Sequence, residues 1–115
     1  MPISISSGRT AEDAYRAPRA MALDDHVEDD LWALVGRLTR DLQQLRRLGS
    51  PPDFTDETFS PDEIAALERD IEYLVADGSE VGPVLTPLLK HGLVRLRTYL
   101  EQAERTNSFV HAHIE

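Results

Sequence analysis

Two histidines near the end of the chain are the first candidates for chemistry. His111 and His113 stand two positions apart in RTNSFVHAHIE, residues 105–115. Two imidazoles can hold one metal ion when they share a face, as they do on a strand, but on a helix side chains two positions apart diverge by about 200°. We interpret this segment as the frayed end of a helix, with both histidines in solvent. A third metal ligand would have to come from Glu115 or His26.

An arginine six positions before the first histidine gives the tail a second interpretation. Arg105 and His111 resemble the arginine–histidine motif of the HEPN-domain ribonucleases. The resemblance implies an all-α protein with this pair at a dimer interface, where the histidine helps the RNA 2′-hydroxyl to attack. It covers residues 105–111, and a similar spacing joins Arg19 to His26. An RNase is therefore one alternative function.

Acidic residues around another histidine form a further candidate metal site. His26, Asp29 and Asp30 lie within DDHVEDD and are close enough to reach one ion, which would make the protein a metal-binding helical bundle. The same acids suit the first turns of a helix, where the helix dipole favours negative charge. The sequence contains no Glu-x-x-His pattern of the di-iron bundles and no glycine-rich phosphate loop. We expect no cofactor, and a binding role rather than catalysis.

Composition limits the class of protein. The chain has 115 residues, the size of one domain. Its net charge of −9 argues against a protein that binds nucleic acid by neutralising phosphates. It has no cysteine, which fits the cytoplasm, and no apolar run near the roughly 20 residues that span a bilayer. We expect a cytoplasmic protein that binds neither nucleic acid nor membrane.

The spacing of apolar residues predicts three main helices. Steps of three and four positions recur along residues 24–48, 60–77 and 86–104, and give each segment one buried stripe. Ser60 is followed by a proline and, three positions on, by a glutamate, which is a capping box. Thr86 is also followed by a proline and marks the start of the third helix.

The remaining segments complete an all-α prediction. We assign residues 1–22 to a leader arm, mobile or bound to a partner, with a short helix possible at 11–17, and residues 23–115 to one helical bundle domain. Residues 50–59 are interpreted as a linker. Gly92 lies inside the third helix, where we expect a neighbouring helix to cross closely. The predicted fold is a small bundle of three main helices with a short extra element at one or both ends.

Unequal helix lengths suggest a protein-binding surface. At 1.5 Å per residue the first helix would be about 37 Å long and the second about 25 Å. Part of the apolar stripe of the first helix would therefore face water unless another segment or a partner covers it. The residues expected at this surface are Leu31, Trp32, Leu34, Leu38, Leu45 and Leu48. We therefore expect a non-catalytic interaction module, a small accessory or regulatory subunit that forms a homo-oligomer or docks on a larger protein.

Overall fold

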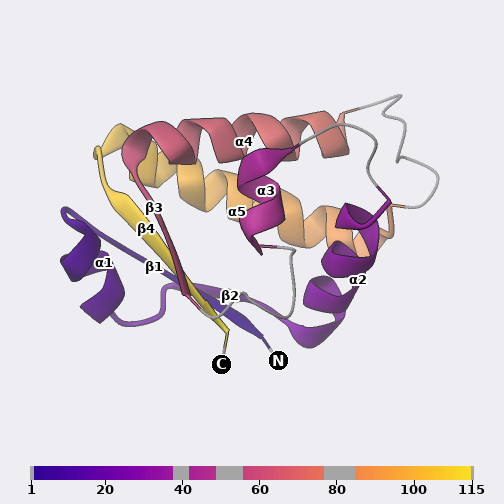
Figure 1. The fold of residues 1–115 in the computed structure, drawn as a ribbon, viewed down its shortest axis with the longest axis horizontal. Coiled ribbons are helices and arrows are strands. Elements are labelled where there is room, and N and C mark those ends of the chain that lie inside the picture. The colour runs from indigo at the N-terminus through magenta and orange to yellow at the C-terminus, as the bar shows by residue number, and fades with distance from the viewer. Residues whose placement is uncertain (1, 38–41, 49–55, 77–84, 115) are drawn as a thin grey trace.

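The computed structural model is an α/β fold, so the all-α prediction is wrong. It describes residues 2–37, 42–48, 56–76 and 85–114. Four strands form one antiparallel sheet in the order β2-β1-β4-β3 (Figure 1). The strands are β1 (Ile3–Gly8), β2 (Met21–Leu23), β3 (Asp56–Phe59) and β4 (Phe109–Ile114). The helices are α1 (Ala11–Arg16), α2 (Asp25–Val35), α3 (Gln43–Leu48), α4 (Pro61–Val75) and α5 (Pro87–Arg105).

The two ends of the chain meet at the centre of the sheet. β1 and β4 pair antiparallel from Ile3 opposite Ile114 to Gly8 opposite Phe109, and the N- and C-terminal ends lie side by side (Figure 1). The segment assigned to a leader arm, residues 1–22, therefore supplies β1, α1 and the first two residues of β2. Each strand has six residues or fewer, so its stretch of alternating buried and exposed positions is short and was not interpreted as a strand from the sequence.

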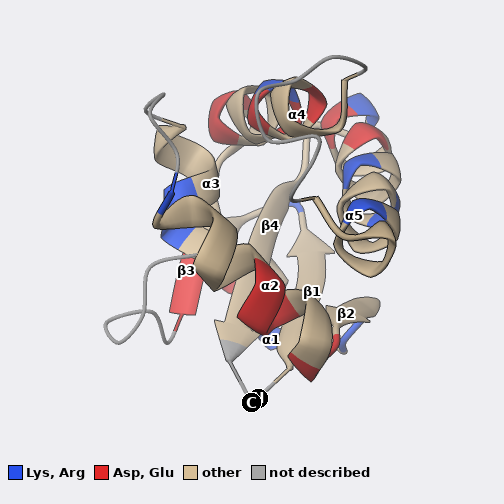
Figure 2. Cartoon of the chain, turned by 90° about the vertical axis from the view of Figure 1, so that its right-hand side faces the viewer, with Lys and Arg blue, Asp and Glu red and all other residues tan. Residues whose placement is uncertain are grey.

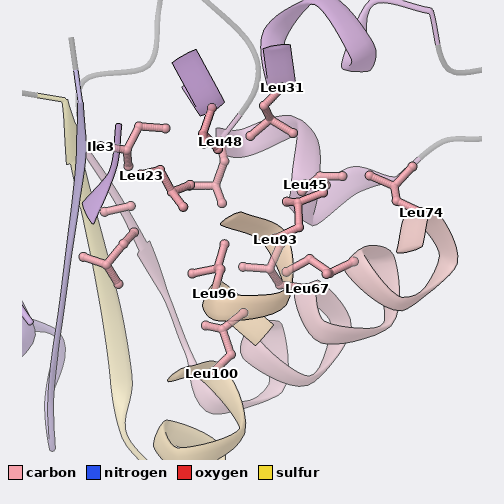
Figure 3. Packing of buried hydrophobic residues seen from close by; sticks show 14 of the residues in the cluster. Ile3, Leu23, Leu31, Leu45, Leu48, Leu67, Leu74, Leu93, Leu96 and Leu100 are labelled. Carbon is pink, nitrogen blue, oxygen red and sulfur yellow. The ribbon is translucent and has the colours of Figure 1, made fainter. Parts of the chain in front are cut away.

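A single hydrophobic core lies between one face of the sheet and helices α2 to α5. Ile3 and Leu23 from the strands meet leucines of all four helices there (Figure 3). The opposite face of the sheet carries α1, which contacts β1, β3 and β4. Acidic and basic residues are both distributed along α4 and α5 (Figure 2). Within the described part of the chain, no helix is long and apolar enough to cross a membrane.

The long first helix of the sequence analysis is two helices. α2 ends at Val35 and α3 begins at Gln43; residues 38–41 lie outside the described part of the chain. The indole Nε1 of Trp32 donates a hydrogen bond to the carbonyl oxygen of Leu48 at 3.0 Å. In one continuous helix these two residues would be about 24 Å apart along the axis. The chain therefore folds back, and the length mismatch that suggested a binding surface does not exist.

The other two helices confirm the predictions from their start signals. The capping box at Ser60 is present, with Glu63 Oε1 accepting from the Ser60 backbone N–H, and α4 begins at the following proline. Thr86 caps α5 in the same position relative to its proline. The close crossing at Gly92 is also confirmed, because a Cβ placed there would lie 2.9 Å from Cγ1 of Val27 in α2. These signals are local, and the structure preserves each of them.

A buried glutamate between α4 and α5 makes stability depend on pH. Glu68 is buried, which raises its pKa, and the neighbouring Glu104, Glu101 and Glu72 raise it further, to about 8. Below pH 4.5 both the folded and the unfolded chain hold this proton. Between pH 4.5 and 8 only the folded chain keeps it, so the free energy of unfolding falls as pH rises.

Replacing this carboxyl by an amide should therefore stabilise the protein at pH values above 4.5, the usual pKa of a glutamate. We expect Glu68→Gln to raise the free energy of unfolding by about 2 kcal/mol at pH 7 and to change it little at pH 4. Urea unfolding at both pH values measures the difference. The matched control is Asp62→Asn, an exposed position on the same helix that is not among the charges raising this pKa, for which no such pH-dependent gain is expected. An equal gain for Glu68→Gln at both pH values would contradict the titration as its cause.

Candidate metal centre

Three potential metal ligands meet on the face of the sheet that carries α1. His113 of β4 lies opposite Asp56 of β3 in the strand register, and His111 lies opposite Thr58. Side chains alternate between faces along a strand, and the valine and the alanine on either side of His111 are buried in the core. The two histidines therefore share the other face with Asp56 and Thr58. This is the strand geometry that the interpretation of the tail as a helix end had excluded, and that interpretation is wrong.

One carboxylate oxygen joins the two imidazoles. Oδ1 of Asp56 lies 2.9 Å from Nε2 of His111 and 2.8 Å from Nδ1 of His113. One ligand atom from each residue lies within 4.8 Å of the other two. The side chain of His111 is 6% exposed, whereas that of His113 is 49% exposed. The group thus has one buried, fixed imidazole and one that reaches solvent.

A threonine hydroxyl holds the buried imidazole in place. Thr58 Oγ1 lies 3.0 Å from Nδ1 of His111. When Nε2 of a neutral His111 donates to the ionised Asp56, Nδ1 accepts from the Thr58 hydroxyl. A hydroxyl can also accept, so Nδ1 can instead carry the proton and donate to Thr58, which leaves Nε2 free for a metal ion. Thr58 therefore supports both states of the imidazole without moving.

Helix α1 closes one side of the group. The ring of Tyr15 packs edge-on against His111, with ring centroids 5.1 Å apart and planes at 81°. The Ser6 hydroxyl, on β1, donates a hydrogen bond of 2.7 Å to the carbonyl oxygen of Ala14. Thr10 caps the helix by accepting from the Asp13 backbone N–H. These contacts fix α1 on the sheet and hold Tyr15 beside the imidazole.

The carboxyl group of Asp56 is ionised at neutral pH. Burial alone would raise its pKa, but the hydrogen bonds and charges of His113 and His111 outweigh that effect and lower the pKa below its usual value. Both imidazoles are aimed at the same oxygen, which favours negative charge there. A negative oxygen between two nitrogens is also what a divalent cation requires.

The distances fit a tetrahedral transition-metal ion after a small adjustment. Bonds of about 2.0–2.1 Å from zinc to imidazole nitrogen and carboxylate oxygen correspond to ligand–ligand distances of about 3.3 Å. The two hydrogen-bonded distances at Asp56 are 2.9 and 2.8 Å, so each would have to lengthen by about half an ångström. The exposed His113 and Asp56 side chains have room to do this, while the buried His111 stays on Thr58.

The same residues also form a hydroxyl–imidazole–carboxylate chain, as in nucleophilic hydrolases. In the serine-protease arrangement Nε2 faces the nucleophile and Nδ1 faces the acid. Here the order is reversed, because Nδ1 of His111 faces Thr58 and Nε2 faces Asp56. Thr58 does not line the pocket in front of the group, whereas both histidines and Asp56 do. The hydroxyl therefore orients the imidazole rather than facing a substrate.

The other predicted chemical sites are not assembled. Arg105 is the exposed last residue of α5, and His111 is buried on β4; the described interactions of His111 are with Thr58, Asp56 and Tyr15, not with Arg105. The all-α dimer that the HEPN resemblance implies does not match this fold.

The alternative metal site on α2 is not brought together either. His26 and Asp29 are exposed on α2, and Asp30 accepts a hydrogen bond from the Thr86 hydroxyl at 3.0 Å. Among the described residues, the group whose ligand atoms converge is Asp56, His111 and His113. Of this group, the sequence analysis had considered His111 and His113 as a metal pair, whereas Asp56 was not among the candidates.

The leucines predicted to form an interface lie in the core. Leu31, Leu34, Leu45 and Leu48 are buried, three of them labelled in Figure 3. Trp32 is partly buried, and Leu38 lies outside the described residues. These leucines are covered by the chain itself, so they offer no surface to a partner in this fold.

A cap signal in the sequence could have revealed the site. Asn107 has a left-handed backbone (φ 53°), and Ser108 N–H donates to Ala103 C=O, which is a Schellman ending of α5. Asparagine is among the few residues that adopt this conformation readily. After it, apolar and polar residues alternate along VHAHI, residues 110–114. Asp56 carried no local signal of its own.

Comparison with known proteins gives this site no precedent. No family model matches the chain, and neither a curated protein nor a solved structure is significantly similar to it. The functional argument therefore depends on the residues themselves.

Proposed function

We propose that this protein binds one divalent transition-metal ion, zinc being the best match, through Asp56, His111 and His113. The observation that carries the proposal is the convergence of both histidines on one carboxylate oxygen at 2.9 and 2.8 Å. Two imidazole nitrogens and a carboxylate oxygen are a common ligand set for zinc. Calcium and magnesium prefer oxygen ligands, so this set disfavours them.

The hydrogen bond to the buried histidine and the position of the ligands on strands support the same proposal. Imidazoles that bind metal usually donate their other N–H to a fixed acceptor, and Thr58 Oγ1 occupies that position for His111. The three ligands come from two neighbouring strands, which are more rigid than loops. Sheet pairing therefore sets their separation before any ion arrives.

Titration of the purified chain with zinc tests the proposal. We expect one ion per chain by calorimetry, and a free energy of unfolding that rises by about 2.7 kcal/mol when free zinc is at 100 times its dissociation constant. Calcium at the same concentration should give no comparable stabilisation, which makes it the control cation. If zinc neither binds at one equivalent nor stabilises the fold, the three side chains are a hydrogen-bonded tie between β3 and β4 and the proposal fails.

Two broader proposals come from the sequence alone. We propose that the protein works in the cytoplasm, a suggestion supported by its lack of cysteine. A protein partner or a second copy of the chain also remains a proposal. Among the described residues, the large hydrophobic side chains that are exposed are Tyr15 and Leu88. They lie on different elements, so neither marks a broad apolar surface.

A further inference from the structure

A groove lies between helix α5 and the edge strand β2, away from the metal centre. Its volume of about 360 Å³ is within the range of small-molecule sites. Met21 of β2 forms one side of this α5 groove. One face of α5 forms the other side, and its lining residues are His91, Val94, Arg95, Thr98, Tyr99 and Gln102.

The α5 groove and the metal centre lie on opposite faces of the sheet. Met21 pairs with Ile5 of β1, which is buried in the core. Residues directly opposite each other on neighbouring strands point to the same face, so Met21 faces the side that carries α2 to α5. The metal centre lies on the side that carries α1. A ligand of the α5 groove therefore needs no metal ion, and the inference does not depend on the metal-binding function.

The inner surface of the groove is apolar and held in place. Met21 and Tyr99 are partly buried and packed against the hydrophobic core. The Tyr99 hydroxyl donates a hydrogen bond of 2.7 Å to Ser7 Oγ, which ties the ring to β1. Val94 lies between them in exposure, neither fully buried nor fully open to solvent. The apolar part of a ligand resting on these three side chains would displace water from them.

A positive charge without a partner lies at the rim of the groove. Arg95 is exposed, and its guanidinium makes no ion pair or hydrogen bond with the described part of the chain. Residues three and four positions away on a helix are neighbours, and at Arg95 these are a histidine, a glycine, a threonine and a tyrosine. The acids of α5 are Glu101 and Glu104, and Glu101 already faces Arg97 at 3.9 Å. None of the described residues that line the groove is acidic, so a ligand anion meets no competing carboxylate there.

The other polar groups of the groove give further donors. The Thr98 hydroxyl donates its proton to the carbonyl oxygen of Val94 at 3.1 Å, so it is not available as a donor. The side-chain amide of Gln102 and the imidazole of His91 line the groove beside Arg95 and each carry an N–H. The polar side of the groove therefore offers donors to a ligand that brings acceptor oxygens.

We propose that the α5 groove binds a small amphipathic carboxylate. Its apolar chain lies on Met21, Val94 and Tyr99, and its carboxylate accepts hydrogen bonds from Arg95, whose planar donors match the two oxygens. The volume is that of a site for one small molecule. Strand β2 has three residues, too short an edge to hold an added peptide strand by backbone pairing.

Octanoate is the probe, and a titration followed through the backbone amide NMR signals gives both its affinity and its position. We expect saturable shifts at Met21 and along the groove face of α5. Octanamide has the same chain without the charge, and should bind at least about 5-fold more weakly. Acetate has the charge without the chain, and should give no saturable shift. Added salt should weaken the binding of octanoate and leave that of octanamide unchanged.

Two variants on α5 test the assignment of the contacts. Arg95→Gln should weaken octanoate binding at least about 5-fold and leave octanamide binding unchanged. The matched control is Lys90→Gln, an exposed cation on the same helix that does not line the groove, which should bind octanoate as the wild type does. Thr98→Trp places a large ring in the groove at an exposed position and should abolish the binding of both ligands. Urea unfolding checks that each variant keeps its fold.

Three results would overturn the inference. The first is the absence of a saturable response to octanoate. The second is a set of shifts centred on α1 and β4, which would place the ligand on the other face of the sheet. The third is an equal loss of octanoate affinity in Arg95→Gln and Lys90→Gln, which would make net charge rather than a contact the cause. Zinc is absent from all of these measurements, so their failure leaves the metal-binding function standing.

Discussion

Replacing His113 by alanine is expected to lower zinc affinity by more than about 100-fold. Removing a group that merely orients a metal ligand costs 10- to 100-fold, and loss of a ligand costs more. His113 is the suitable ligand to remove because its side chain is 49% exposed, so its loss leaves no large cavity. Calorimetric titration with zinc gives the affinity, and urea unfolding without metal confirms that the fold is intact.

The control distinguishes this site from the predicted alternative on α2. The other candidate group consists of His26, Asp29 and Asp30. His26→Ala removes its exposed histidine and should leave zinc affinity unchanged. If His26→Ala removes binding and His113→Ala does not, the ion is held on α2 and the site on the sheet is wrong. His111→Gln is a further test, because a glutamine preserves much of the side-chain volume while removing the imidazole nitrogen.

The parts of this fold that the sequence predicts are those encoded over a few neighbouring residues. The capping box at Ser60 and the threonine cap at Thr86, each followed by a proline, place the starts of α4 and α5 correctly. Thr10 caps α1 where a short helix was considered possible. Gly92 marks the close crossing of α2. Each signal acts within one turn of helix or at one contact, so no knowledge of the distant chain is needed.

The sheet is not predictable in that way. β1 and β4 pair between residues that are more than one hundred positions apart, such as Ser6 and His111. The alternating stretch in each strand is at most six residues long, and β2 has three. An apolar stripe with helical spacing also continued across α2 and α3, although the chain folds back between them. Periodicity alone does not reveal such a reversal.

The sequence reveals the histidine pair of the candidate metal centre, but not the aspartate and the threonine beside it. His111 and His113 were recognised as a pair, and their spacing fits a strand. Asp56 and Thr58 are 55 and 53 positions away from His111, in a segment interpreted as a linker. Their position beside the histidines follows from the register of β3 on β4. That register depends on the packing of Phe59 and Val110 in the core, which is a property of the whole fold.

Replacing Gly8 by alanine is expected to destabilise the fold by about 3 kcal/mol and to disturb the metal centre with it. A Cβ at Gly8 would lie 2.6 Å from both the backbone nitrogen of Ala14 and the carbonyl carbon of Asp13. Both are backbone atoms of α1, so the helix as a whole would have to move, and overpacking of this kind costs about 1–3 kcal/mol or more. A displaced α1 would also carry Tyr15 away from His111.

Gly36→Ala is the matched control for this effect. Gly36 has a right-handed backbone (φ −65°, ψ −15°), and an added Cβ would make an ordinary contact of 3.7 Å with the Ala33 carbonyl oxygen. It should be neutral or stabilise the chain by about 0.5 kcal/mol, because alanine restricts the unfolded state. Urea unfolding and zinc titration of both variants give the comparison.

If Gly8→Ala does not fold, Ser6→Ala tests the same attachment of α1 more mildly by removing the hydrogen bond to Ala14. Wild-type stability and zinc affinity in both Gly8→Ala and Ser6→Ala would contradict the role of α1 in holding the site.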